Sequence, residues 1–320
     1  AGYIGSHTVY RLIESGNEVV VFDNLETGHI EAVHPKAKFY KGDLRNRSEI
    51  DSVFDKEKGI DAVIHFAANS LVGESMTNPL KYYDNNLNGT KVLLQSMVAH
   101  GIDKIVFSST AATYGEPESI PILETDRTLP TNCYGETKLS MEKMFKWTSK
   151  AYNLRYVSLR YFNACGAHPN GKIGEAHNPE THLIPLVLQV PNGKREYISV
   201  FGNDYDTKDG TCVRDYIHVN DLAQAHILAM EYLSKGGESN IFNLGNGVGF
   251  TVKEVIETAR KVTNHTIPIR EEERRTGDPS VLIASSEKAR KVLGWKPQYA
   301  DLETIISTAW KWHVNHPDGY

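Results

Sequence analysis

Short apolar runs alternate with amphipathic segments along the first half of the chain. The runs are rich in β-branched residues and lie at 19–22, 38–43, 62–68, 104–110 and 156–162. The segments between them repeat their apolar positions with helical spacing, and lie at 6–15, 49–57, 85–101 and 134–150. Because the runs lack in-out alternation, we expect strands buried on both faces and joined by right-handed crossover helices. The pattern predicts an α/β fold with a doubly wound parallel sheet.

The pattern becomes less regular in the second half. Two segments, at 166–182 and 201–216, are rich in loop-forming residues. We therefore predict two domains, residues 1–165 with the parallel sheet and residues 166–320 as a smaller α/β domain that binds a substrate. A strand-then-helix pattern at 216–235 predicts that the chain returns to the first domain.

Length and charge exclude some classes of partner. The chain has 320 residues, enough for one large or two modest domains at about 150 residues each. No uninterrupted apolar run approaches the roughly 18 residues that span a bilayer, so we expect no membrane association. The net charge of -5 offers no basic field for a phosphodiester backbone, which argues against nucleic acid.

The cysteines and histidines give no pattern of a metal site. Cys133, Cys165 and Cys212 are odd in number and irregularly spaced, which indicates neither a disulfide framework nor thiolate ligands. His177 and His182 match no familiar ligand spacing, so we expect no catalytic metal. The cysteine usage is typical of a reducing compartment, and we expect a cytoplasmic protein.

The first residues carry part of a dinucleotide-binding turn. Gly2 and Gly5 match its last two glycines, which let the backbone approach a pyrophosphate at a helix N-terminus. Asp23 ends the first apolar run, where a carboxylate binds ribose hydroxyls and repels a 2'-phosphate. The spacing predicts a Rossmann-like domain that binds NAD. A parallel sheet needs a strand before this turn, so we also predict that the protein extends upstream of Ala1.

Tyr134 and Lys138 lie one helical turn apart. An ammonium beside a phenol lowers its pKa and makes it a base near neutral pH. One Tyr-x-x-x-Lys is expected roughly by chance among 16 tyrosines, so the pair alone is weak. The run at 104–110 adds weight because it ends in the hydroxyls of Ser108, Ser109 and Thr110, at the strand end where ligands bind.

Segments along the whole chain carry a family resemblance: GYIGSH, DNL, GDLRN, HFAA, YYDNN, FSSTAATYG, YGETK, LRYFNACGAHP, FGNDYDTKDGTCVRDYIHV and RRTGDP. They resemble the UDP-glucose 4-epimerases of the extended short-chain dehydrogenase group. The resemblance implies reversible epimerisation of UDP-galactose and UDP-glucose through a 4-keto intermediate with tightly bound NAD. Tyr134 would act as the base, Lys138 would hold the nicotinamide ribose, and Thr110, where many members have serine, would donate to the 4-oxygen.

The resemblance also assigns binding residues. Those for the cofactor are Gly2, Tyr3, Ile4, Gly5, Asp23, Asn24, Gly28, Asp43, Leu44, Phe66, Ala67, Ala68, Asn85, Tyr134, Lys138 and Phe162. Those for the UDP-sugar are Thr110, Tyr161, Asn163, His182, Leu183, Ser199, Val200, Phe201, Arg214, Arg275, Asp278 and Leu282. The guanidinium groups among them suit phosphate oxygens, which they bind bidentately.

Two positions depart from the family pattern. His182 replaces a common Asn, which changes the hydrogen bonds available there. Leu282 stands where some members have a tyrosine beside the sugar 2-substituent. We hypothesise that the smaller side chain admits UDP-GalNAc and UDP-GlcNAc. By analogy with the family, we expect the helices around 85–100 and 136–147 to form the interface of a homodimer.

Two other functions are weighed against epimerisation. Sugar-nucleotide 4,6-dehydratases share the fold, NAD and Tyr-x-x-x-Lys, but carry an Asp-Glu pair where this sequence has Ala111 and Ala112. A non-enzymatic NAD-binding sensor on the same fold is the other alternative. The presence of Thr110, Tyr134 and Lys138 together favours an enzyme.

Overall fold

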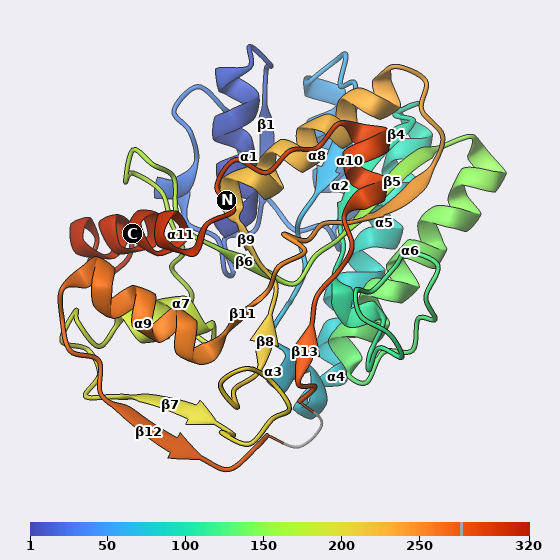
Figure 1. Ribbon diagram of the computed structural model, residues 1–320. Coiled ribbons are helices and arrows are strands. Elements are labelled where there is room, and N and C mark those ends of the chain that lie inside the picture. The colour runs from blue at the N-terminus through green and yellow to red at the C-terminus, as the bar shows by residue number, and fades with distance from the viewer. Residues whose placement is uncertain (276–277) are drawn as a thin grey trace.

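Parallel strands from residues 1–165, together with β10, form two sheets (Figure 1). The computed structural model describes residues 1–275 and 278–320. One sheet pairs β1 with β2, and the other has the order β10-β5-β4-β3, with every pair parallel. The bounds are β1 (Val20–Asp23), β2 (Lys38–Lys41), β3 (Val63–His65), β4 (Lys104–Ser108), β5 (Arg155–Arg160) and β10 (Asn240–Asn243). Each predicted apolar run contains a strand, and the α/β fold class is confirmed.

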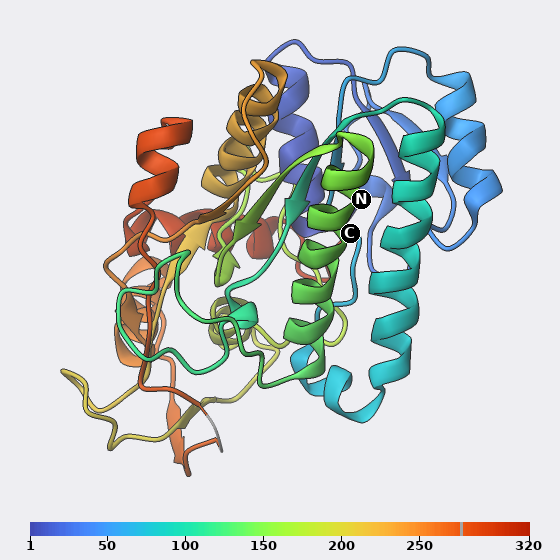
Figure 2. The ribbon, with the colours of Figure 1, turned by 90° about the vertical axis from the view of Figure 1, so that its right-hand side faces the viewer.

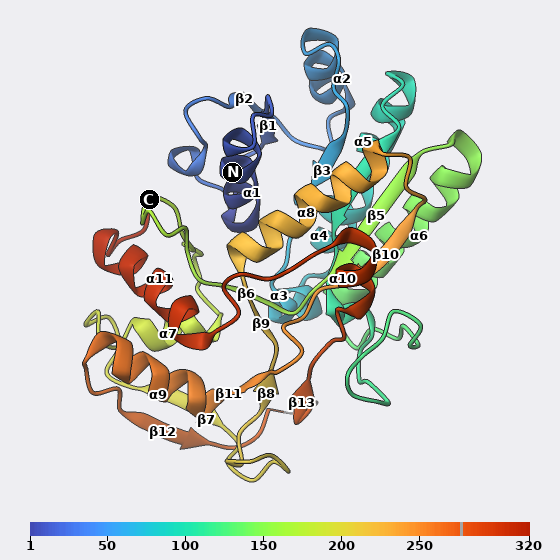
Figure 3. The ribbon, with the colours of Figure 1, turned by 45° about the horizontal axis from the view of Figure 1, so that its top comes forward.

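Helices cover both faces of the larger sheet because successive strand residues point to opposite sides. In β4, Val106 packs in the core under α8 and α10, whereas Ile105 and Phe107 pack in the core under α2, α5 and α6. Figure 2 shows α5 and α6 side by side, and Figure 3 shows α1 beside α8. The bounds are α1 (Tyr3–Glu14), α2 (Arg47–Lys56), α5 (Gly89–Ala99), α6 (Cys133–Tyr152), α8 (Val219–Ser234) and α10 (Glu287–Leu293).

The two parallel sheets do not share a hydrogen-bonded edge. Within residues 1–275 and 278–320, β1 pairs with β2 alone and β3 pairs with β4 alone. Val21 of β1 and Val63 of β3 line the same cavity. The strand ends that bear Asp23 and His65 therefore border the same space.

The second half of the chain contributes a separate core. The helices α7 (Leu183–Leu188), α9 (Val252–Thr263) and α11 (Leu302–Asn315) pack on one another and on β7 (Ile198–Phe201), which pairs with β12 (Ile269–Glu272). A capping box starts α9, because the Thr251 hydroxyl accepts the Glu254 N–H and the Glu254 carboxylate accepts the Thr251 N–H. The other strands are β6 (Asn163–Cys165), β8 (Val213–Arg214), β9 (Tyr216–His218), β11 (Phe250–Thr251) and β13 (Val281–Leu282).

The chain crosses between these regions more than once. After β9, α8 packs against α1, β4 and β5, and β10 then joins the larger sheet beside β5. The short elements are η1 (Ile30–Ala32), α3 (Val72–Thr77), α4 (Pro79–Tyr82), the π-helix η2 (Tyr83–Asn88) and the 3₁₀ turn η3 (Ala111–Thr113). The domain boundary at residue 165 stays a prediction. Among the described residues, no helix has the length and apolar character to cross a membrane.

Candidate active site

A cavity of about 1930 Å³ brings most of the expected site residues together. It runs from the first turn of α1 past the ends of β3 and β4 to β8 and β13. The expected residues that line it are Gly2, Tyr3, Ile4, Gly5, Asp23, Leu44, Phe66, Ala67, Ala68, Thr110, Tyr134, Lys138, Tyr161, Phe162, Asn163, His182, Arg214, Arg275, Asp278 and Leu282. Residues far apart in sequence thus face one space.

The start of α1 suits an anion. Gly2 is its N-cap and supplies no side chain, so the amide groups of the first turn are not capped by a side chain. A Cβ on Gly2 would meet nothing within 4 Å, and the first turn contains no acidic residue. The helix dipole adds partial positive charge at this end. These residues therefore fit the pyrophosphate of a dinucleotide.

Asp23 lies at the end of β1 beside this helix start. Its Oδ1 accepts the Leu25 N–H at 2.8 Å, and its Oδ2 lies 2.9 Å from the backbone nitrogen of Ala1. Gly28 packs close by, since a Cβ there would lie 3.0 Å from Ala1 and 3.1 Å from the Asp23 carboxylate. A larger residue at 28 would push against the carboxylate, which gives Gly28 a role in shaping this corner without lining the cavity.

Three other expected cofactor residues also lie outside the cavity lining. Asp43 pairs with Arg45 at 2.7 Å, and this guanidinium holds the pKa of the Asp43 carboxyl well below its usual range. Asn24 donates to the same carboxylate at 3.3 Å. Asn85 donates to the side chain of Asn86 at 3.1 Å. Each polar group therefore has a protein partner in this structure.

The N-terminus of α6 positions Tyr134 and Lys138. Asn132 caps the helix by accepting the Gly135 N–H at 2.8 Å. Gly135 lies against the backbone of Ala112, where a Cβ would come within 2.6 Å of the carbonyl oxygen. This close approach holds the start of α6 against the segment that follows β4. The two elements that bear the expected catalytic groups are thereby fixed to each other.

Lys138 is directed at the strand end and not at the phenol. Its Nζ donates to the Ser108 carbonyl oxygen at 2.8 Å and lies 4.8 Å from the centroid of the Phe107 ring. The same Nζ is 5.8 Å from the Tyr134 ring centroid. Lys138 is only 4% exposed, so its ammonium has lost most of its hydration.

Burial decides the pKa values of this pair. Desolvation raises the pKa of the Tyr134 phenol to about 12, although a hydrogen bond with the Thr110 side chain opposes the rise. Desolvation lowers the pKa of Lys138 to about 7. The expected lowering of the Tyr134 pKa by Lys138 is therefore wrong for this structure. The Lys138 ammonium donates a hydrogen bond to the Ser108 carbonyl oxygen, and the side chains of Tyr134 and Lys138 are both removed from water.

Among the three residues at this strand end, Thr110 carries the hydroxyl that best fits the expected role of donor to the sugar 4-oxygen. It follows β4, accepts the Ala112 N–H at 3.1 Å and is 8% exposed. Ser109, its neighbour, donates to Glu142 at 2.6 Å, and that carboxylate is held in turn by Arg160. Ser108 shares a hydrogen bond with the Tyr161 hydroxyl. Thr110 thus carries the hydroxyl that contacts Tyr134.

The far end of the cavity carries two guanidinium groups. Arg214 pairs with Asp278, and Arg275 stacks on the Phe201 ring with 4.0 Å from its guanidinium carbon to the ring centroid. Leu282 and Phe162 pack against a small buried cluster near the end of β4. This end therefore offers positive charge for phosphates beside an apolar wall.

Four expected substrate residues do not line the cavity. Along β7, burial alternates, so Val200 is 1% exposed and points into the core of the second region. Ser199 and Phe201 are half-buried on the opposite side of the strand. Leu183 packs against the same core as Val200. Successive side chains of a strand point to opposite faces, so Val200 cannot face the same side as Ser199 and Phe201.

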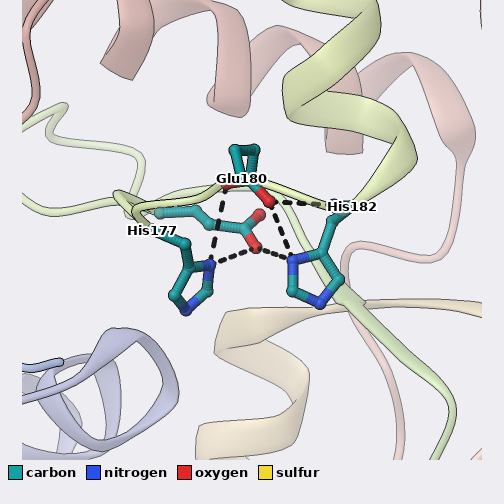
Figure 4. Close-up of side chains that lie close together, drawn as sticks. His177, Glu180 and His182 are labelled. Carbon is teal, nitrogen blue, oxygen red and sulfur yellow. Dashed lines mark hydrogen bonds and ion pairs between the residues drawn. The ribbon is translucent and has the colours of Figure 1, made fainter. Parts of the chain in front are cut away.

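His182 faces a group of residues that the sequence analysis does not combine. Figure 4 shows His177 and His182 pointing toward Glu180. Glu175 and His177 also line the cavity, and the two imidazoles share the carboxylates of Glu175 and Glu180. The signal in the sequence is a repeated Glu-x-His, at 175–177 and again at 180–182. A search for the repeat, instead of for histidine spacing alone, would have found it.

Comparisons with known proteins identify the family of this chain. The sequence model of the NAD dependent epimerase/dehydratase family matches residues 1–245. The chain belongs to this family. As a member of the epimerase/dehydratase family, it is 61% identical over 320 residues to a UDP-glucose 4-epimerase from Halalkalibacterium halodurans, with coverage of 100% of this chain and 95% of the relative. NAD is the cofactor of this family, and the anion site at α1 fits it.

Solved structures of other family members have the same fold. A UDP-glucose 4-epimerase superposes with a TM-score of 0.99 at 57% identity, covering 100% of this chain and 97% of that one. The Bifidobacterium longum UDP-glucose 4-epimerase, solved with NAD+ and UDP, gives 0.93 at 39% identity, with coverage of 100% and 98%. The Campylobacter jejuni UDP-Glc/GlcNAc 4-epimerase gives 0.87 at 43% identity, with coverage of 98% and 97%.

Proposed function

We propose that this protein is a UDP-glucose 4-epimerase that interconverts UDP-galactose and UDP-glucose. One observation carries the proposal: Thr110, Tyr134 and Lys138 meet at the strand-end side of a cavity whose other end holds Arg214 and Arg275. The hydroxyls of Thr110 and Tyr134 can act on the oxygen of one sugar carbon. The two guanidinium groups can bind a diphosphate at the other end of the cavity. The relatives named for this activity support the same assignment.

Tyr134 is the proton acceptor in this proposal. Its phenolate would take the proton of the sugar 4-hydroxyl and return it to the 4-oxygen later in the cycle. Thr110 would donate to the same oxygen and so hold it beside the phenol. Because the pKa of Tyr134 is about 12 here, the phenolate needs stabilising charge from its surroundings when it forms.

Lys138 orients the groups around the reacting carbon. NAD, when bound, would supply the hydride acceptor for the sugar C4. Lys138 is anchored by the Ser108 carbonyl and can donate its remaining protons to ribose hydroxyls. The resulting 4-keto sugar would then turn and receive the hydride on its other face.

The turn of the sugar requires a firm hold on the rest of the substrate. Arg214 and Arg275 would bind the diphosphate, with Asp278 keeping Arg214 in place. The sugar region borders Leu282 and Phe162, which are apolar and offer it no fixed hydrogen bond. A gripped diphosphate and a loosely held sugar are what the proposed turn demands.

An NMR time course tests this function. Purified protein is mixed with UDP-galactose without added cofactor, and we expect the anomeric signal of UDP-glucose to appear up to an equilibrium mixture. The same mixture should form from UDP-glucose. Failure of both reactions, even after NAD is added, would contradict the epimerase assignment. Appearance of a stable 4-keto-6-deoxy product would instead favour a 4,6-dehydratase.

We propose further that UDP-GalNAc and UDP-GlcNAc are substrates. Leu282 lines the cavity, and a leucine leaves more room than a tyrosine beside the sugar 2-substituent. The similarity to the C. jejuni UDP-Glc/GlcNAc 4-epimerase supports this specificity. We expect Leu282→Tyr to abolish conversion of UDP-GalNAc and to spare that of UDP-galactose. If Leu282→Tyr left the rates on both UDP-GalNAc and UDP-galactose unchanged, the proposed role of Leu282 would be wrong.

We propose a cytoplasmic homodimer as the working form. The predicted interface is formed by α5 and α6, and the apolar side chain of Trp147 on α6, which is 65% exposed, supports it. The three free thiols support a reducing compartment. Light scattering after size exclusion should give twice the chain mass of 35.8 kDa. A monomer mass at micromolar concentration would reject the dimer.

A further inference from the structure

The loop before α7 gathers two histidines and two glutamates around one point. One ligand atom from each of Glu175, His177, Glu180 and His182 can be chosen so that all lie within 4.8 Å of one another. Both imidazoles present Nδ1 to the carboxylates, as Figure 4 shows for His177, Glu180 and His182. Because both imidazoles contact the same two carboxylates, the four side chains surround a common point.

The separations between imidazole and carboxylate are close to those that a metal ion requires, although His177 and His182 contact different oxygens of Glu180. The Nδ1 of His177 lies 3.1 Å from Glu175 and 3.6 Å from Glu180, and the Nδ1 of His182 lies 2.9 Å and 3.0 Å from the same two carboxylates. Around a tetrahedral zinc ion with bonds of about 2.0–2.1 Å, neighbouring ligand atoms lie about 3.3 Å apart. Small side-chain shifts would bring the four atoms to these separations.

Charge and burial are compatible with a cation at this centre. The side chains of Glu175 and Glu180 are only 4% and 8% exposed. Two carboxylates this deeply buried need positive charge nearby, which the two imidazoles supply when they are protonated and which a metal ion would supply in place of their protons. With neutral imidazoles the four ligands carry a charge of about −2, which a divalent ion balances. Imidazole nitrogen favours a transition metal over Mg²⁺ or Ca²⁺, which prefer oxygen ligands alone.

We propose that Glu175, His177, Glu180 and His182 form a binding site for one Zn²⁺ ion. The sequence analysis expects no metal at His177 and His182 because it considers only the spacing of the two histidines. The folded loop brings the carboxylates of Glu175 and Glu180 beside them. The site is structural in kind, because four protein ligands complete a tetrahedral shell and leave no open position for a substrate.

The surroundings indicate what the ion would hold together. The Glu175 carbonyl accepts a hydrogen bond from the Trp312 indole of α11 at 3.0 Å. The Ala176 carbonyl lies 2.9 Å from Nε2 of His29, which comes from the nucleotide-binding region. His177 and His182 line the cavity, with the Tyr3 ring in edge contact with His177. A bound ion would therefore stabilise this loop, which forms part of the cavity wall and contacts both halves of the chain.

Metal content and spectroscopy test the site independently of activity. We expect the protein purified without chelators to retain close to one zinc per chain by mass spectrometry. After chelation, titration with Zn²⁺ against a chromophoric chelator should restore one site and raise Tm by several degrees. Titration with Co²⁺ should give the strong visible bands of tetrahedral coordination.

Matched variants locate the binding. His177→Ala should weaken Zn²⁺ binding at least about 100-fold, since even outer-shell changes around a metal cost about 10–100-fold. It should also remove the zinc-dependent rise in Tm. The control, His265→Ala, removes an exposed histidine remote from the loop in sequence and should match wild type.

Two results would overturn the proposal. Absence of retained zinc, of zinc-dependent stabilisation and of tetrahedral Co²⁺ bands in wild type would leave the four residues as a set of His-Glu ion pairs. Zinc binding that is equal in wild type and His177→Ala would move the ion to another place. The wild-type measurements decide the question even if the variant fails to fold.

Discussion

The Tyr134 phenol and the Lys138 ammonium are neighbours in sequence spacing but respond separately to burial. Loss of water raises the pKa of the phenol to about 12 and lowers that of the ammonium to about 7. Both shifts favour the neutral form of the group. A helical spacing of four residues establishes that two side chains share a face, whereas their pKa values depend on the environment that the rest of the fold supplies.

Tyr134→Phe tests the proton acceptor. We expect kcat to fall by about 10²–10⁴-fold, the usual contribution of a positioned proton-transfer group, while bound NAD is retained. The measurement is the rate of UDP-galactose conversion together with the NAD content of the purified protein. Tyr152→Phe changes an exposed tyrosine on the same helix and should keep wild-type rates. A loss of less than tenfold in Tyr134→Phe would remove Tyr134 from its proposed role.

Lys138 also makes the stability of the fold depend on pH. In the folded protein its pKa is about 7, against an ordinary value of 10.5. Between these values the unfolded chain binds more protons, so the contribution of Lys138 to the free energy of unfolding rises with pH. Below pH 7 both states are protonated and the contribution is constant and unfavourable.

The matched experiment is denaturant unfolding of wild type and Lys138→Met at pH 7, 8 and 9. We expect wild type to gain about 2 kcal/mol relative to the variant between pH 7 and 9, at about 1.4 kcal/mol per unit. Lys143→Met, at an exposed lysine of the same helix, should show no such pH-dependent difference. A difference that is the same at all three pH values would show that Lys138 keeps an ordinary pKa.

At the scale of elements, α6 connects the proposed catalytic residue Tyr134 to the core. Its first turn carries Tyr134, and two turns further along its buried face Met141 and Phe145 pack under the sheet. The preceding helix is less regular than its pattern predicts, since a π-helical segment, η2, comes before α5. The Asn86 amide in that segment bonds to the Asn69 carbonyl and to Thr137 of α6. Apolar periodicity does not detect this polar link because it comes from a buried asparagine.

Phe145→Ala tests the contribution of the buried face. Phe145 is fully buried, and its ring lies 5.0 Å from that of Phe107 on β4. We expect the free energy of unfolding to fall by about 3–5 kcal/mol, because the change leaves a cavity in a packed core. Chemical denaturation measures it. Lys146→Ala, at the exposed neighbour, should change stability by less than about 0.5 kcal/mol. A comparable loss in both variants would contradict the packing argument.

Across the whole molecule, the cavity joins groups from both halves of the chain. Thr110 and Tyr134 come from the first half, and Arg214 and Arg275 come from the second. A ligand that touches both sets binds the folded protein alone and should stabilise it by mass action. The arrangement therefore predicts that ligand binding and global stability are coupled.

Arg214→Met tests that coupling. We expect the Kd for UDP, measured by calorimetry, to rise about 10–100-fold, since the variant loses a guanidinium-phosphate contact and leaves Asp278 without its partner. The rise in Tm on adding UDP should shrink in step. Arg195→Met removes an exposed arginine outside the cavity and serves as the control. An unchanged Kd in Arg214→Met would exclude this residue from the diphosphate site.

Local pattern in the sequence determined the elements and much of their chemistry. Apolar runs located five strands of the parallel sheets, and helical spacing located α1, α2, α5 and α6, because side-chain periodicity follows directly from backbone geometry. The glycine turn, Asp23 and the Tyr134-Lys138 pair were also readable, since each depends on residues that are close in sequence.

The tertiary structure alone decided how these parts meet. It turned Val200 into the core while Arg214 faced the cavity, and set the pKa shifts of Tyr134 and Lys138. It also folded the loop of Glu175 and His182 around one centre. These outcomes depend on desolvation and on contacts between distant segments. Periodicity along the chain carries no information about either until the segments are packed together.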